Sequence, residues 1–281
     1  MAGVAGKRVV ITGATNGIGL AAAEALAAKG AELAIVARDE AKATAVAERV
    51  GGADVLLADL GSQASVRAVA AEALARYPRI DVLVNNAGAI FSSRRLTDDG
   101  IEQTWALNHL APFLLTNLLL DGLKQSAPAR VVTTSSDAHS GARIPFDDLD
   151  AERSYASRGF RRYSETKLAN ILFTRELARR LDGTGVTANC FHPGLVATGF
   201  NRNNGVLMNI AMTFAKPFSR NAEKGAETLV WLVDSPDAAN ESGGYFEDCR
   251  PAKPSSAARD DDAARRLWDV SEQQTRKRAA A

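Results

Sequence analysis

The sequence has few of the side chains from which metal sites and disulfide frameworks are built. Its 281 residues include two cysteines, Cys190 and Cys249, and three histidines, His109, His139 and His192. The cysteines have neither CxxC nor metal-ligand spacing, so we expect two free thiols in a reducing compartment. The histidines lie in separate segments without zinc-ligand spacing, and we therefore predict no metal site. A serine hydrolase is not expected either, because the sequence has no GxSxG nucleophile elbow.

A surplus of charge of one sign is also lacking. The chain has 34 basic and 33 acidic residues, which give a formal net charge of +1. This balance provides no electrostatic reason for nucleic acid or an anionic membrane to be the main partner. We therefore expect no nucleic-acid partner.

Long uninterrupted hydrophobic runs are missing as well. The most apolar stretch, residues 107–123, is interrupted by polar side chains that include Asn108, Asn117 and Asp121. These groups favour a buried helix over a lipid-spanning one. The first strand-like run begins at Arg8, so we expect no signal peptide and no membrane anchor. The sequence predicts a cytoplasmic protein.

Short apolar runs alternate with longer segments rich in Ala, Leu, Glu and Arg. The expected strands, short and often β-branched as in parallel sheets, are Val9–Thr12, Leu33–Val36, Val55–Ala58, Val82–Asn85, Val131–Thr134 and Thr187–Phe191. The expected helices include Ile18–Ala28, Ser62–Arg76 and Tyr163–Leu181. This alternation predicts an α/β fold: a single-domain Rossmann-type doubly wound parallel β-sheet with helices on both faces.

No linker divides the chain, and we expect one domain over residues 1–249. The remainder, residues 250–281, is predicted to be a C-terminal tail. It contains one short helix candidate, Ala263–Val270, and we expect disorder beyond Gln273.

A glycine-rich turn follows the first expected strand and leads into a helix. Glycine permits a tight turn and lets a phosphate approach the helix N-terminus, where free N–H groups favour negative charge. The GxxxGxG spacing predicts a dinucleotide site at Gly13, Thr15, Asn16, Gly17, Ile18 and Gly19. On this segment alone, a flavoprotein, a methyltransferase or a chance glycine turn remains an alternative.

The end of the second expected strand distinguishes between the nicotinamide cofactors. NAD enzymes usually have an acidic residue here, whereas this chain has Arg38 after Ala37. A guanidinium suits a ribose 2′-phosphate, so we expect NADP(H) rather than NAD(H). Asp39 could instead pair with Arg38 at the surface. Asp59 and Leu60, after the third strand, are expected near the adenine, although Asp59 could also cap a helix.

Tyr163 and Lys167 are four residues apart on an expected helix and so share one face. A free tyrosine has a pKa near about 10, which makes it a slow proton donor near neutrality. A cation at ~4 Å contributes on the order of 4 kcal/mol at an effective dielectric of 20, or roughly three pKa units before desolvation opposes it. We therefore expect Lys167 to lower the pKa of Tyr163 and to fit it for proton transfer.

Four motifs, taken in order, are similar to those of the short-chain dehydrogenase/reductase family. They are the turn Thr12–Gly19, the run Asn85–Gly88, Ser136 after a strand, and the Tyr163–Lys167 segment. The resemblance extends from about Lys7 to Cys249. It implies an enzyme that moves a hydride between NADP(H) and a small-molecule carbonyl or alcohol.

The resemblance also implies roles for individual residues. Tyr163 would be the acid/base, and Lys167 would lower its pKa and bind the nicotinamide ribose. Ser136 would hydrogen-bond the substrate oxygen, and Asn108 would hold a water that connects Lys167 to solvent. The alternatives are strand-end capping for Ser136 and a polar kink within a helix for Asn108. Further cofactor contacts are implied at Asn86, Ala87, Gly88, Pro193, Gly194, Val196 and Thr198.

Ser136 and Tyr163 are 27 positions apart, and this long spacing resembles the retinol-dehydrogenase-like branch of the family. Vertebrate members of that branch often carry a membrane anchor, which this sequence is expected to lack. A lid is expected at residues 198–220, whose apolar side chains favour a hydrophobic ketone or aldehyde. The alternative is that these side chains only pack the lid onto the core.

The sequence leaves two alternative functions. One is a catalytically silent NADP(H)-binding sensor or scaffold of the same fold. Such a protein would be expected to lose catalytic groups, whereas this chain has all four, Asn108, Ser136, Tyr163 and Lys167. An epimerase or dehydratase would be expected to have a longer C-terminal domain. Related proteins often pair through the helices that bear Asn108 and Tyr163, which implies a homodimer or homotetramer. Trp268, in the tail, would cover such an interface or fold back on its own chain.

Overall fold

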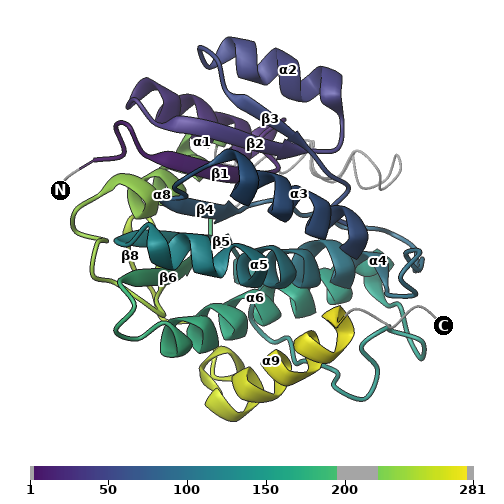
Figure 1. Ribbon diagram of the computed structural model, residues 1–281. Coiled ribbons are helices and arrows are strands. Elements are labelled where there is room, and N and C mark those ends of the chain that lie inside the picture. Colours follow the sequence, from purple (N-terminus) through teal and green to yellow (C-terminus); the bar gives the residue numbers. More distant parts are fainter. Residues whose placement is uncertain (1–2, 195–220, 277–281) are drawn as a thin grey trace.

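The computed structural model describes residues 3–194 and 221–276. Its centre is an eight-stranded sheet in the order β3-β2-β1-β4-β5-β6-β7-β8, in which only the last pair is antiparallel (Figure 1). The strands are β1 (Arg8–Thr12), β2 (Glu32–Ala37), β3 (Asp54–Leu57), β4 (Val82–Asn85), β5 (Ala129–Thr134), β6 (Val186–Phe191), β7 (Tyr245–Glu247) and β8 (Arg250–Pro251). The predicted Rossmann-type α/β fold is confirmed.

All six predicted strands are present, with ends that differ by at most two residues. Most of their side chains are apolar and buried, which produces the short apolar runs seen in the sequence. The strands β7 and β8 were not predicted. With three and two residues, they are too short to produce a periodic signal.

Helices cover both faces of the sheet. One core cluster joins a face to α1 (Gly17–Ala28), α2 (Glu40–Arg49) and α8 (Ala222–Asp234). A second core cluster lies beneath α3 (Gln63–Arg76), α5 (Ala111–Gln125) and α6 (Phe160–Arg180). A third packs α6 against the residues just before α5 and the C-terminal segment. The short helix α4 (Gln103–Trp105) precedes a π-helical turn, Ala106–Leu110, that runs into α5. In the described ranges, no helix combines the length and apolar character needed to span a bilayer.

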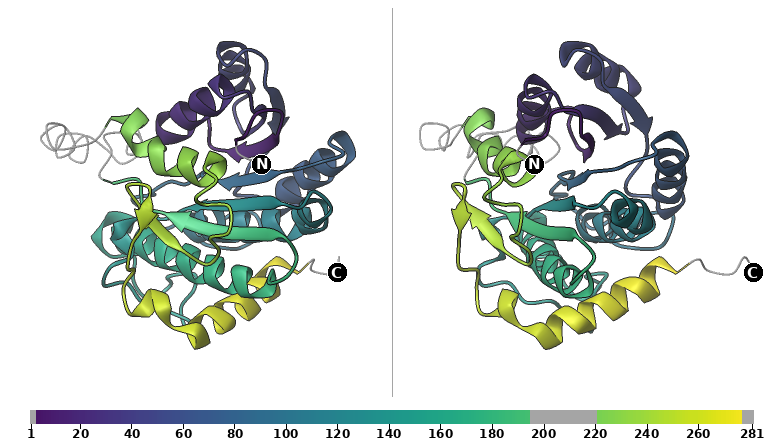
Figure 2. Two further views of the ribbon diagram at one scale, coloured as in Figure 1. Left: turned by 90° about the vertical axis from the view of Figure 1, so that its left-hand side faces the viewer. Right: turned by 60° about the vertical axis from the view of Figure 1, so that its left-hand side comes forward.

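The C-terminal helix α9 (Asp261–Thr275) is longer than the predicted Ala263–Val270 and continues past Gln273, where we expected disorder. Asp260 caps its N-terminus by accepting a hydrogen bond from the Ala263 N–H. One face of α9 is buried against α5 and α6, and its central side chain, Trp268, is only 4% exposed. The helix folds back on its own chain and forms an outer layer over α6 (Figures 1 and 2).

Candidate active site

A cavity of about 930 Å³ opens at the C-terminal ends of the parallel strands, where α/β sheets usually bind ligands. All the predicted site residues within the described ranges, apart from Asn108, line this cavity: Gly13, Thr15, Asn16, Gly17, Ile18, Gly19, Arg38, Asp59, Leu60, Asn86, Ala87, Gly88, Ser136, Tyr163, Lys167, Pro193 and Gly194. Val196, Thr198 and the expected lid at residues 198–220 lie outside the described residues.

The glycine turn is shaped by close contacts that exclude side chains. Gly13 has a φ of +70°, and a Cβ there would lie 2.7 Å from the Cα of Ala87. A Cβ on Gly19 would overlap the carbonyl oxygen of Gly13. Asn16 is the N-cap residue of α1 but makes no side-chain capping hydrogen bond, so the first N–H groups of the helix stay available to an anion. This cradle fits the phosphates of a nicotinamide dinucleotide.

Asn86 stabilises the turn from the neighbouring strand. Its Nδ2 donates to the carbonyl oxygens of Thr12 and Gly13 at 3.1 and 3.2 Å, and its Oδ1 accepts from the Thr134 hydroxyl at 3.2 Å. Asn86 therefore connects the ends of β1, β4 and β5. The sequence predicted that Asn86 lines the cofactor path, but it did not reveal that the side chain also builds the glycine turn.

Arg38 and Asp59 lie at the end of the cavity formed by β2 and β3. Asp39, which could have neutralised Arg38, instead caps α2 and binds Lys42 Nζ at 2.5 Å. Within residues 3–194 and 221–276, no ion pair holds the Arg38 guanidinium. Asp59 Oδ1 accepts from the Gly61 N–H at 2.9 Å, and the cap of α3 is Ser62 rather than Asp59. Both predicted side chains therefore face the cavity from exposed positions.

The two serines at the end of β5 have different environments. Ser135 is 1% exposed, and its hydroxyl donates to the Lys167 carbonyl at 2.8 Å. Ser136 lines the cavity, and its Oγ accepts from the Ala138 N–H at 3.2 Å. Ser136 is therefore both a cap of the turn Asp137–His139 and a hydroxyl that faces the cavity. The capping alternative and the predicted substrate contact are compatible.

Tyr163 and Lys167 face the cavity from α6, as predicted. Lys167 Nζ lies 5.3 Å from the centre of the Tyr163 ring and donates to the Thr134 carbonyl at 3.1 Å. Burial raises the pKa of Tyr163 to about 12, although a hydrogen bond with Ser136 acts in the opposite direction. Burial also lowers the pKa of Lys167 to about 8. The pKa of Tyr163 is therefore shifted upwards rather than in the expected downward direction, because burial has the largest influence on the phenol.

Asn108 lies in the π-helical turn, with no exposed surface. Its Oδ1 accepts from the Ala89 N–H, and its Nδ2 donates to the Ala89 carbonyl, each at 2.9 Å. The Nδ2 group also donates to the Thr166 hydroxyl at 3.1 Å. Asn108 thus links the loop after β4 to α6 from behind the cavity wall. The irregular helix agrees with the kink alternative, since a π-turn widens the helix at this point.

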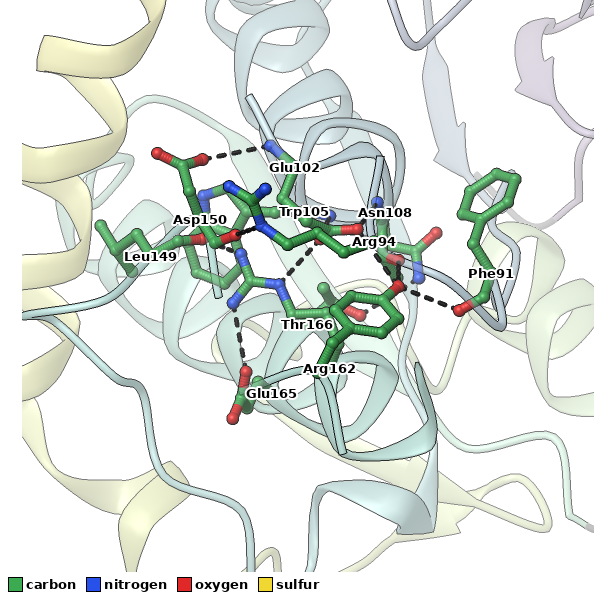
Figure 3. A network of polar contacts seen from close by, with 12 residues as sticks. Phe91, Arg94, Glu102, Trp105, Asn108, Leu149, Asp150, Arg162, Glu165 and Thr166 are labelled. Atoms are coloured by element: carbon green, nitrogen blue, oxygen red, sulfur yellow. Dashed lines mark hydrogen bonds and ion pairs between the residues drawn. The ribbon is translucent and has the colours of Figure 1, made fainter. Parts of the chain in front are cut away.

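A buried ionic network lies behind the same wall (Figure 3). The Arg162 guanidinium binds Glu102 Oε2 at 2.8 Å and Glu165 Oε2 at 3.1 Å, and it also donates to the Leu149 carbonyl. Glu102 in turn accepts hydrogen bonds from the N–H groups of Thr104 and Trp105 at the start of α4. The network therefore joins the start of α6 to the helix of Asn108 and to the segment between Ser136 and Tyr163.

The apolar side of the cavity was missed by the sequence analysis. Phe91, Leu96 and Phe160 line it, and Leu96 and Phe160 remain 50% and 48% exposed. Phe160 precedes Tyr163 by three residues on α6, and the two ring centres are 6.2 Å apart. That spacing was a signal the sequence offered, since residues three apart share a helix face. Among the described residues, no group of three or more His, Cys, Asp or Glu side chains is placed to hold a metal ion.

The sequence of this chain is similar to those of a known protein family. The family model for short chain dehydrogenases matches residues 7–146. Retinol dehydrogenase 14 of Mus musculus is 44% identical over 95% of this chain and 85% of its own length. Retinol dehydrogenase 12 of Homo sapiens is likewise 44% identical, with the same coverage of both chains.

Solved structures agree with these relatives. An uncharacterized protein of Mycobacterium paratuberculosis superposes with a TM-score of 0.79 at 34% identity, over 98% of this chain and 95% of its own. A short chain dehydrogenase of Burkholderia cenocepacia, solved in complex with NADP, superposes with a TM-score of 0.70 at 27% identity, over 86% and 96% of the two chains. The chain therefore belongs to the short-chain dehydrogenase/reductase family of nicotinamide-dependent oxidoreductases, in its retinol-dehydrogenase-like branch.

Proposed function

We propose that this protein is an NADP(H)-dependent oxidoreductase that interconverts a hydrophobic carbonyl compound and its alcohol, with Tyr163 as the acid/base. The observation that carries the proposal is the meeting of Ser136, Tyr163 and Lys167 in the cavity that also contains the glycine turn. One cavity thus brings together a phosphate cradle, two hydroxyl groups and a cation.

The bound cofactor would supply or accept the hydride. On the protein side, the Ser136 Oγ accepts the Ala138 N–H and is hydrogen-bonded to the Tyr163 hydroxyl, so a substrate oxygen placed beside the two hydroxyls can accept from either of them. A phenol with a pKa of about 12 holds its proton throughout the neutral range and can deliver it to that oxygen as the carbonyl is reduced. Reduction is therefore the direction that Tyr163 is best prepared for.

Lys167 supports this reaction as a local positive charge. With a pKa of about 8 it is largely protonated at neutral pH, and it stabilises negative charge that develops on the phenol as the proton leaves. It lies near Gly88, where a Cβ would come within 3.6 Å of Nζ. One N–H of the ammonium group is directed at the Thr134 carbonyl, and the others can donate to the hydroxyls of a bound ribose.

Two further observations support the finer assignments. Arg38 lines the cavity while Asp39 is engaged by Lys42, and this supports a preference for the 2′-phosphate of NADP(H). Phe91, Leu96 and Phe160 support an apolar substrate. The free thiols Cys190 and Cys249 are consistent with a cytoplasmic setting.

The experiment is to follow NADPH and NADH oxidation over a panel of aldehydes and ketones, with Tyr163→Phe as the matched variant. We expect turnover that favours NADPH and falls by about 10²-fold or more in the variant, while NADPH binding stays unchanged. The rival function is a silent NADP(H)-binding protein. NADPH binding without turnover of any substrate would favour that rival, and undiminished turnover in Tyr163→Phe would remove the proposed acid/base.

A further inference from the structure

The peptide group that joins Ser136 to Asp137 is held at both of its polar atoms by imidazole rings. His139 Nδ1 lies 2.7 Å from the Ser136 carbonyl oxygen. The Asp137 N–H donates to His192 Nδ1 at 3.1 Å. Because a carbonyl oxygen can only accept, the hydrogen of the His139 ring must be on Nδ1.

His139 is itself fixed from the far end of the chain. The ring is 1% exposed, and its Nε2 accepts from the Ser255 N–H at 3.1 Å. It also meets the Tyr245 ring edge-on, with ring centres 5.2 Å apart. A neutral imidazole with its hydrogen on Nδ1 satisfies both hydrogen bonds at once. The His139 side chain therefore connects the segment after β8 to the turn that follows β5.

We propose that His139 is a positioning residue that fixes the direction of the Ser136 hydroxyl. This role of His139 rests on the proposed function, in which Ser136 binds the substrate oxygen. Ser136 caps the turn Asp137–His139, and the Ala138 N–H of this turn occupies one acceptor site of Oγ. Two bonds from His139 close the same turn on the Ser136 carbonyl, one from its backbone N–H at 3.1 Å and one from Nδ1 at 2.7 Å. Loss of the Nδ1 bond removes one of these two, so the Ser136 peptide is held less firmly and its Oγ is directed less accurately into the cavity.

Two variants separate the two ends of the imidazole ring. The amide nitrogen of Asn can occupy the place of Nδ1, whereas the polar atoms of Gln reach the place of Nε2. His139→Asn therefore keeps a donor for the Ser136 carbonyl and loses the acceptor for Ser255. His139→Gln keeps the acceptor for Ser255 and loses the donor for Ser136. Each variant is therefore the matched control for the other.

We expect His139→Gln to lower kcat for carbonyl reduction by about 10- to 100-fold, with the Kd for NADPH unchanged, because a small misplacement of a catalytic group has effects of this size. We expect His139→Asn to stay within about threefold of the wild type. Equal losses in both variants, or a loss that follows thermal stability rather than the Asn/Gln difference, would overturn the proposal.

A double-mutant cycle tests whether His139 acts through Ser136. In a Ser136→Ala background, His139→Gln should cause no further loss of kcat. If Ser136→Ala alone leaves kcat intact, the proposed function has lost its substrate-oxygen donor. If Ser136→Ala lowers kcat and His139→Gln lowers it further by the same factor as in the wild type, only the positioning role is overturned.

A measurement on the unmodified protein does not depend on whether the variants fold. The chain has three histidines, so the ring nitrogens can be assigned in ¹⁵N-histidine spectra. We expect His139 to be the neutral tautomer with its hydrogen on Nδ1. A neutral ring with its hydrogen on Nε2, or a protonated ring at neutral pH, would contradict the geometry on which the proposal stands.

Discussion

Arg162 and Glu102 form an ion pair that is almost completely withdrawn from solvent. The Arg162 Nε lies 2.8 Å from Glu102 Oε2, and the two side chains are 2% and 0% exposed. The guanidinium also lies over the Trp105 ring, 4.6 Å from its centre. Because Arg162 directly precedes Tyr163, this pair fixes the first turn of the helix that presents the proposed acid/base.

Arg162→Met should lower the free energy of unfolding by about 3–5 kcal/mol, because it leaves the Glu102 carboxylate buried without its partner. Urea denaturation measures the change. The matched control is Arg161→Met, whose 63% exposed side chain binds the other oxygen of Glu165. The control should change stability by about 1 kcal/mol or less. Wild-type stability in Arg162→Met would mean that the buried pair does not hold this region together.

The burial of His109 predicts that the protein loses stability in acid over a defined pH range. Burial lowers its pKa from 6.5 to about 3, and its Nε2 lies 2.8 Å from the Ser271 hydroxyl of α9. The unfolded chain therefore binds a proton between pH 6.5 and 3 that the folded chain does not bind. The contribution of the uncharged His109 to the free energy of unfolding is complete above about pH 6.5. It falls as the pH drops towards 3, by up to about 5 kcal/mol.

The measurement is the free energy of unfolding at several pH values between 7.5 and 4.5. His109→Gln places an amide where Nε2 stood and removes the titrating group. The variant should lose less stability over this range than the wild type. Identical pH profiles in the two proteins would show that His109 does not carry the effect.

Trp268 should contribute strongly to stability, since its ring packs against Phe113 and Phe173 and beneath the Arg180 guanidinium. Trp268→Ala is expected to cost about 3–5 kcal/mol and to lower the Tm by roughly 10 °C. Asp269→Ala, at an exposed position of the same helix, serves as the control and should leave the Tm nearly unchanged. A Tm that Trp268→Ala does not lower would show that α9 adds little to the fold.

Arg38 should determine the preference between the two nicotinamide cofactors. Arg38→Ala removes a charge-assisted contact to the 2′-phosphate, so the KM for NADPH should rise by about 10- to 100-fold while that for NADH stays nearly constant. Asp39→Asn is the control, because Asp39 is engaged by Lys42 and Asn caps a helix equally well. A similar change for both cofactors in Arg38→Ala would contradict the assignment.

Patterns within short stretches of the sequence predicted the elements that form from residues close together in the chain. The strands from β1 to β6, the turn at Gly13 and the helix that presents Tyr163 each follow from apolar runs, glycine spacing or helical periodicity. The role of Ser136 was predicted from the similarity to a known family. Each of these features depends on residues close together in the sequence.

Features that depend on distant contacts were not predictable in this way. The bonds of Asn86 to the glycine turn span more than 70 positions, and the contact of His139 with Ser255 spans 116. The direction of the Tyr163 pKa shift also differed from expectation, because spacing along a helix shows which charge is near but not how much solvent is lost. The length of α9 depends on an apolar face that the rest of the protein covers.

The position of α9 has a consequence for biosynthesis. A chain is made from its N-terminus, and its elements fold as they emerge, so this helix is added after the helix of Tyr163 is complete. Until it docks, Phe113 and Phe173 lack the ring of Trp268 that covers them. A product that ends before residue 261 would display this aromatic surface to chaperones and proteases. Translation through α9 is thus a condition for covering the aromatic core of this protein.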